Sequence, residues 1–473
     1  MDPSTFSSPA SWWERLTLQT LPLYQWRSSS YVARIVGLLQ NWRSGSWILN
    51  YGDGVGLGLL ALLFAAAPYV PTTTISILLI ACIAFWGLLT LSEARSATGW
   101  GLTPIHLMVM LYWGIAVIAT GLSPVKMAAL EGLSKLTLYL LLFVVSARVL
   151  RIDKYRSTLI TVYLLTALFV SGYAIRQWMF GAPPLATWSD PDSEMGNFTR
   201  VYSFLGNPNL LSSYLMPAIA YSAMAIFAWV GPYRKALAGV MFVCNLASVI
   251  FTFSRGGWIG LVLMFGTIAL LLGYWMNLYR RKWVLPAIVG GLGGLILVSV
   301  VLVPPVRNRV LSMFVGRGDS SNNFRINVWM SAIEMIKARP ILGIGPGNDA
   351  FNQIYPLFSR VRFTALSAYS VLLEIAVETG FIGLTCFLWL LLVTFTQAGV
   401  QLKKLRDLGS AQGFWLMGAI GSMAALLGQG FVDTVWYRPH INTLWWLSVA
   451  IVASFYSTLP TDLRKPSREA SNL

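Results

Sequence analysis

Stretches of about 20 residues without charge recur along the whole chain, and they restrict its fold more than any other feature. A helix of that length crosses the ~30 Å hydrocarbon core of a bilayer. The composition agrees, because 56% of the residues are hydrophobic, 11% are charged and the mean hydropathy is +0.64, whereas about a quarter of the residues of a soluble domain are charged. The strands of a membrane barrel would instead alternate in short segments. The sequence therefore predicts an all-α polytopic membrane protein.

Twelve of these stretches are predicted to span the membrane, and an even number places both termini on one side. Pro71 and Pro104 mark two boundaries, since proline fits at or before the first helical turn. The predicted spans cover residues 53–70, 73–92, 102–121, 130–149, 157–180, 207–230, 236–253, 257–278, 283–303, 380–400, 412–432 and 441–459.

The other residues complete the predicted organisation. Residues 1–50 carry arginines among repeated tryptophans and are expected to lie along the cytoplasmic interface as a tail. Residues 51–303 hold spans 1–9, and residues 304–380 form one large outward loop with short amphipathic helices. Residues 381–459 hold spans 10–12, and residues 460–473 form a second cytoplasmic tail.

The net charge of +16 is interpreted as a consequence of membrane orientation rather than of nucleic-acid binding. With the amino terminus inside, every short loop obeys the rule that Lys and Arg gather on the cytoplasmic side. We therefore expect a multi-pass protein of the bacterial inner (plasma) membrane, surrounded by lipid, with both termini cytoplasmic. The large outward loop is the exception, because it is rich in basic residues: Arg307, Arg309, Arg317, Arg325, Lys337, Arg339, Arg360 and Arg362.

Ser254-Arg255-Gly256-Gly257 joins two apolar spans with almost no loop. An arginine so near the hydrocarbon is costly and usually faces a cavity or a partner, although it can also extend to the headgroups. The two glycines let the backbone turn tightly or approach a ligand closely. We expect Arg255 to bind an anion.

Within the large loop, residues 324–340 are predicted to form an amphipathic helix, because apolar residues recur there at helical spacing. Lys337 and Arg339 would close this helix and complement its dipole. Arg325 would open it, where a cation is mildly unfavourable, so we expect an anionic partner for Arg325. The run Gly343-Ile344-Gly345-Pro346-Gly347 follows and is interpreted as a tight chain reversal, since it lacks the Lys-Ser/Thr ending of a phosphate loop.

Glu374 and Glu378 lie one helical turn apart after the glycine run. Such a pair can provide a general base and its neighbour, or form salt bridges with Arg360 and Arg362.

No cofactor and no metal site are predicted, because neither histidine lies near a cluster of carboxylates or cysteines in the sequence. One histidine, His106, falls within the third span. The other belongs to a compact polar set of Asp433, Arg438 and His440, which we interpret as a structural ion pair at the outer mouth of the last span.

In combination, four motifs resemble the O-antigen ligase and polymerase superfamily, over most of residues 200–400. They are Ser-Arg-Gly-Gly at 254–257, Gly-Asn-Pro-Asn at 206–209, the Arg325-x-x-x-Trp329 helix and the glycine run at 343–347. Two further segments, 366–370 and 433–439, are similar to the IctB branch, whose members are described as bicarbonate transporters because of a link to inorganic-carbon accumulation.

The resemblance implies that two outward arginines hold a polyprenyl-diphosphate sugar donor and that a histidine activates the acceptor hydroxyl. Arg255 and Arg325 match the two arginines, whereas Tyr369 stands where the ligases have their histidine. A tyrosine with a pKa near ~10 is a poor base at neutral pH compared with an imidazole near ~6.5. Further arginines are expected to contribute to the same anion site: Arg200, Arg360 and Arg362.

Two functions remain open on the sequence. In the first, an IctB-type protein supports inorganic-carbon accumulation, with Lys135 and Arg176 as an intramembrane path for a small anion. In the second, an enzyme transfers a glycan from a lipid diphosphate, and Glu374 or Glu378 replaces the missing histidine as base. A third possibility is a scaffold that binds a membrane-protein partner through the tryptophan-rich tail.

Overall fold

The computed structural model describes residues 11–21, 36–93, 101–183, 200–278, 320–360, 363–433 and 435–456, together with parts of 283–318. Within these residues the secondary structure is helical, and no strand occurs.

Eight of the described helices are long and apolar enough to cross a membrane, which confirms the all-α polytopic membrane class. They are α6 (Thr72–Leu91), α7 (Pro104–Gly121), α8 (Lys126–Val149), α9 (Asp153–Phe180), α10 (Pro208–Ala228), α11 (Pro232–Phe251), α12 (Arg255–Trp275) and α17 (Val371–Asp407). Three shorter or less apolar helices lie on further predicted spans: α5 (Gly52–Ala66), α18 (Gln412–Gly430) and α19 (Pro439–Ser454). The span predicted at 283–303 falls mostly outside the described residues.

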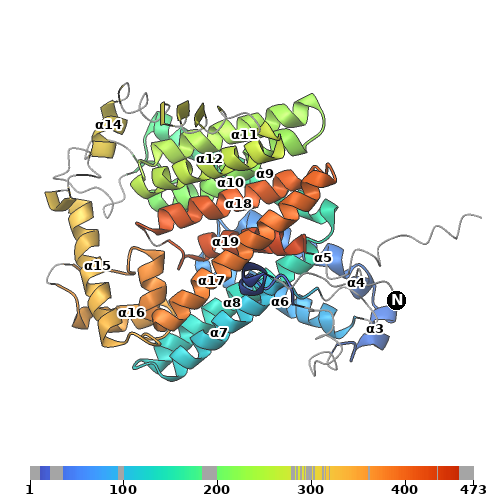
Figure 1. Ribbon diagram of the computed structural model, residues 1–473, viewed down its shortest axis with the longest axis horizontal. Helices are drawn as coiled ribbons and strands as arrows, with labels where there is room; N and C mark the ends of the chain where they lie inside the picture. Colours follow the sequence, from blue (N-terminus) through green and yellow to red (C-terminus); the bar gives the residue numbers. More distant parts are fainter. Residues whose placement is uncertain are drawn as a thin grey trace, which may run out of the picture.

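The helical bundle has two ends, which lie on opposite sides of the view in Figure 1. α14 (Pro304–Leu311), α15 (Ser320–Ala338) and α16 (Asn348–Ile354) lie at one end, called the α15 end below. α3 (Gln40–Gly45) and α4 (Trp47–Asn50) lie at the other, called the α3 end.

One described helix of the expected tail lies against the side of the bundle. α1 (Trp12–Leu16) packs against the flank of the bundle, where Trp389 Nε1 donates a hydrogen bond of 2.7 Å to the Leu16 carbonyl oxygen. Trp389 lies midway along α17, and Thr17 is fully buried. Two other described helices of the tail, α3 and α4, lie at the α3 end (Figure 1).

The C-terminal helices form the centre of the bundle. Figure 1 shows α17, α18 and α19 between a group made of α9 to α12 and a group made of α6 to α8. α18 packs against α10 and α12, α17 against α7, and α19 against α8. At the α3 end, the buried Arg156 joins three helices, because its guanidinium donates to Ser454 Oγ at 3.2 Å and to Gln412 Oε1 at 2.8 Å. The carboxyl-terminal helices therefore hold the two outer groups together.

The glycine run is fitted into a break in α17. Gly380 has φ 66° inside this helix, and beside the break Ile344 N and Gly345 N donate to the carbonyl oxygens of Val377 and Glu378, each at 2.9 Å. Gly347 packs its backbone on that of Gly132 in α8, where a Cβ on either glycine would overlap main-chain atoms. At Gly132 and Gly347 the two backbones are therefore in close contact and leave no room for a side chain.

Candidate functional site

Arg255 is the first residue of α12 and is only 7% exposed, so its side chain does not extend freely to the headgroup region. Ser254 caps the helix, since its Oγ accepts a hydrogen bond of 3.3 Å from Gly257 N. The two glycines serve helix packing: a Cβ on Gly257 would overlap Ser212 of α10, and one on Gly256 would lie 3.2 Å from Gln429 Cγ of α18. The close packing of α12 against α10 and α18 therefore fixes the position of the Arg255 backbone at the start of α12.

Arg325 lies in the second turn of α15, because this helix begins at Ser320, four residues before the predicted start. The expectation that Arg325 opens the helix is therefore wrong. Its Nη1 donates to Ser321 Oγ at 2.7 Å, and its Nη2 lies 3.8 Å from Asp433 Oδ2. An anionic partner exists after all, and it is a carboxylate of this chain. The interpretation of Asp433, Arg438 and His440 as one ion-paired set is revised, because Asp433 pairs with an arginine from outside that set. Arg438 lies over the Tyr437 ring at 4.9 Å.

Arg200 completes a cluster with these two arginines. Its Nε donates to the Thr252 carbonyl oxygen at 2.9 Å, and its Nη2 donates to Asn209 Oδ1 at 3.2 Å. Burial, helped by repulsion from Arg325 and Arg255 and opposed by the attraction of Asp433, lowers the pKa of Arg200 to about 10. The three guanidinium groups thus share one site with one carboxylate. We call Arg200, Arg255, Arg325 and Asp433 the arginine cluster; three cations and one anion give it a net charge of +2.

Tyr369 borders the arginine cluster. Its backbone has φ 50°, a left-handed conformation that is costly for a bulky residue and often found at functional sites. Its carbonyl oxygen accepts a hydrogen bond of 3.1 Å from Trp329 Nε1, and its ring meets that of Phe324 edge-on at 5.3 Å. Burial, together with nearby Asp433 and against the opposing effect of Arg325, raises the pKa of Tyr369 to about 12. The hydroxyl therefore stays protonated at neutral pH and can donate a hydrogen bond but not act as a base.

The other predicted site arginines are a hydrogen-bonded surface arginine, an arginine outside the described residues and an arginine on α9. Arg360 is exposed and donates to Asn327 Oδ1 of α15 at 3.3 Å. Arg362 lies outside the described residues. Arg176 is exposed near the end of α9, with its guanidinium 5.6 Å from the centre of the Tyr173 ring.

The two glutamates and Lys135 line a cavity of about 460 Å³ beside the arginine cluster. Glu378 Oε1 accepts a hydrogen bond of 2.8 Å from Gly347 N, and Glu374 is buried. Lys135 Nζ lies 2.9 Å from both Glu131 and Asp349. The structure thus brings Lys135, but not Arg176, to the wall of this cavity.

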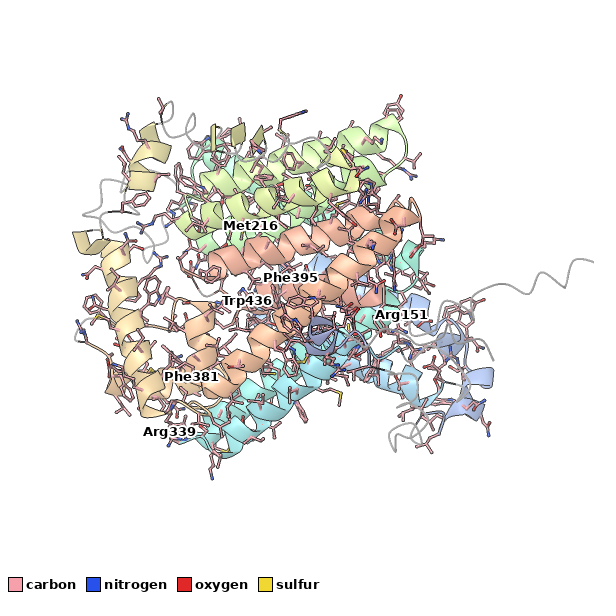
Figure 2. The ribbon with its side chains drawn as sticks, viewed as in Figure 1. Arg151, Met216, Arg339, Phe381, Phe395 and Trp436 are labelled. Carbon is pink, nitrogen blue, oxygen red and sulfur yellow. The ribbon has the colours of Figure 1, made fainter. Side chains whose placement is uncertain are left out.

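Sequence reasoning missed the place of Asp433 among the arginines and the aromatic wall of the cavity. Trp436 follows Asp433 in a short segment between α18 and α19, and Figure 2 shows it in the middle of the molecule. The spacing of these residues carries no helical period, so only the fold brings them to the site. In Figure 2, Arg339 and Phe381 lie near the foot of α15, where Arg339 Nη1 donates to the Leu122 carbonyl oxygen at 3.1 Å.

The fold and the site define a polytopic membrane protein with a buried, net-cationic cluster at one end of its bundle. A family model described as O-Antigen ligase matches residues 240–388, a segment that contains Arg255, Arg325 and Tyr369. No curated protein matches the chain. The match supports the O-antigen ligase superfamily and gives no support to the IctB branch in particular.

Proposed function

We propose that this protein is an O-antigen ligase-like enzyme that binds a polyprenyl-diphosphate-linked glycan and transfers the glycan to an acceptor hydroxyl. The arginine cluster carries the proposal, because residues from four separate parts of the chain place an excess of two positive charges in one largely buried site. A diphosphate diester has two negative charges, and each guanidinium can engage two of its oxygens at once. The matched family model supports the same substrate class.

In the proposed reaction, the acceptor oxygen bonds to the anomeric carbon of the glycan while the bond from that carbon to the diphosphate oxygen breaks. The diphosphate leaves with the electron pair, and the acceptor proton passes to a base. Arginines held in place before the reaction stabilise the charge that develops on the leaving group. Tyr369, protonated at neutral pH, donates a hydrogen bond, and we assign the base to Glu374 or Glu378.

The proposed orientation places the α15 end on the outer side of a bacterial inner membrane. The basic residues of the short loops favour this orientation. A lipid-linked donor would then reach the cluster from the outer leaflet.

Small-anion passage is less well supported by the two residues expected to form its path. Lys135 is held between two carboxylates, and Arg176 lies apart from the cavity that Lys135 lines. A basic side chain already paired in this way offers a poor binding site to bicarbonate.

The decisive experiment is glycan transfer in proteoliposomes that contain purified protein, a polyprenyl-diphosphate oligosaccharide and a soluble glycan acceptor. The wild type should release polyprenyl diphosphate in step with product, whereas Arg255→Ala should not. Arg176→Ala serves as the matched control, because it removes an exposed arginine outside the cluster. The proposal would be overturned if the wild type released polyprenyl diphosphate without forming any acceptor product. Equal transfer rates for Arg255→Ala and Arg176→Ala would also overturn it.

A further inference from the structure

The cavity of about 460 Å³ lies between α6, α8, α16, α17 and α19 and is distinct from the arginine cluster. Its lining includes none of the three clustered arginines. The segment from Asp433 to Pro439 separates the two, since Asp433 pairs with Arg325 while Trp436, Tyr437 and Arg438 line the cavity. The molecule therefore has two neighbouring sites with different linings.

The charges of the cavity are opposite to those of the arginine cluster. Its lining contains two basic residues, Lys135 and Arg438, against four carboxylates, Glu131, Asp349, Glu374 and Glu378. Lys135 is already paired with two of these carboxylates. An anion such as phosphate or bicarbonate would meet net repulsion here.

Four lining side chains carry a buried polar atom without a hydrogen-bond partner among the described residues. Two are donors, the indole N–H groups of Trp436 and Trp445, and two are acceptors, the Oδ1 atoms of Asn348 and Asn442. Trp445 is only 1% exposed. Buried polar groups in folded proteins are almost always paired, so a set of four beside one cavity points to a ligand.

The mixture of donors and acceptors restricts the chemistry of that ligand. An ammonium group only donates hydrogen bonds and a phosphate only accepts them, whereas a hydroxyl group does both. The cavity also presents aromatic faces, with the rings of Trp436 and Trp445 4.3 Å apart and Trp446 nearby. Apolar faces combined with a few converging polar groups are typical of small-molecule sites.

We infer that this cavity binds a neutral, polyhydroxylated group, a sugar unit that carries no phosphate. The inference deepens the proposed function, on which it rests for the ligand's role: the cavity, which Glu374 and Glu378 line, takes a sugar unit, while the arginine cluster takes the diphosphate itself. Binding can be measured without transfer, so the two proposals are tested separately.

The test uses the full-length protein in lipid nanodiscs, because many common detergents are themselves sugars. Calorimetric titration with maltotriose, cellotriose and triacetylchitotriose should show saturable binding of at least one trisaccharide at concentrations up to about 10 mM, ten times a Kd of ~1 mM. Trp436→Phe keeps an aromatic face and removes one indole N–H, and it should weaken binding about fivefold, the usual effect of one hydrogen bond. Trp445→Phe provides a second variant of the same kind.

Trp415→Phe is the matched control, because this buried indole donates to Ser157 Oγ at the α3 end, far along the bundle from the cavity. It should bind the trisaccharide as the wild type does. The inference is overturned if no trisaccharide binds, if both cavity variants bind as tightly as the wild type, or if choline binds in place of sugar. Dimethyl diphosphate, titrated into the same sample, reports on the arginine cluster alone. If dimethyl diphosphate binds and no trisaccharide does, this inference is refuted and the proposed function is not.

Discussion

The guanidinium of Arg325 lies 3.8 Å from the carboxylate of Asp433, although 108 residues (433 − 325) separate them in the chain. Both side chains are largely buried, at 17% and 5% exposure. Close to them, Arg200 and Arg255 bring two further cations. In the free protein, the negative charge of Asp433 thus neutralises part of the positive charge that would attract an anionic ligand.

Asp433→Asn should therefore strengthen the binding of dimethyl diphosphate. The variant keeps the shape of the side chain and removes a negative charge that competes with the ligand, and an interaction of about 1.4 kcal/mol corresponds to a tenfold change. We expect about a tenfold lower Kd at low salt, measured by calorimetry in nanodiscs. An unchanged or higher Kd in a variant with wild-type thermal stability would show that Asp433 does not oppose the ligand.

Replacing Arg255 should weaken the binding of dimethyl diphosphate. Hydrogen bonds to charged groups contribute about 1.5–3 kcal/mol, so Arg255→Ala should raise the Kd for dimethyl diphosphate about tenfold or more. Arg255→Lys should lie between this variant and the wild type, because it keeps the charge and loses the planar pair of donors. Arg176→Ala should bind like the wild type, and a loss of affinity there equal to that of Arg255→Ala would refute the cluster as the binding site.

The affinity of the wild type for dimethyl diphosphate should not change between about pH 5 and pH 8, the range in which histidine sites titrate. The pKa of Arg200 is about 10 and that of Tyr369 about 12, so both groups stay protonated there. The anion favours the protonated guanidinium, and affinity should therefore fall as the pH rises through about 10. A step between pH 6 and pH 7 in calorimetric titrations would reveal a titrating group that the cluster does not contain.

Tyr369→His should add a second proton acceptor beside the arginine cluster, besides the glutamate proposed as the base. Histidine tolerates a left-handed backbone better than most residues, and a neutral imidazole accepts a proton where the tyrosine hydroxyl does not. Transfer by the variant should rise as the pH increases through about 6.5, while Tyr369→Phe should show no such rise. A pH profile of Tyr369→His identical to that of the wild type would mean that this position does not contact the acceptor.

The contact between Gly132 and the glycine run predicts a large effect of a single methyl group. A Cβ on Gly132 would overlap the carbonyl oxygen of Pro346, whereas one on Gly114, also within a helix, meets no atom within 4 Å. Gly132→Ala should destabilise the protein by more than about 2 kcal/mol, as overpacking against a backbone does. Gly114→Ala should be neutral or stabilising by up to about 1 kcal/mol. Thermal unfolding in the same nanodiscs measures both, and equal midpoints would contradict the contact.

Much of the fold follows from local chemistry in the sequence. The charge-free runs and Pro104 at a helix start are local signals, and the structure places α7 from Pro104 onward as expected. The start of α15 was missed by four residues because Ser320 to Asn323 are polar and carry no apolar period. The glycine run was recognised as a turn, but its contact with Gly132 depends on how α8 packs, which no local pattern encodes.

The candidate site was predictable only in part for the same reason. Arg255 stands out in the sequence because it interrupts apolar residues, and Arg325 because of its place near a helix start. The position of Asp433 depends on the packing of α18 between α10 and α12. Nearby residues in the sequence, Arg438 and His440, were therefore the natural partners to expect, whereas the ion pair is made across the fold.

The order of the cluster along the chain has a consequence for biosynthesis. Arg200, Arg255 and Arg325 all emerge from the ribosome before Asp433, which follows α18. Until that late segment is inserted, the nascent protein holds the cations without this acidic counterpart near the hydrocarbon, where unbalanced charge is costly. Chains cut short after α17 should therefore be degraded far more readily than the number of missing residues alone would suggest.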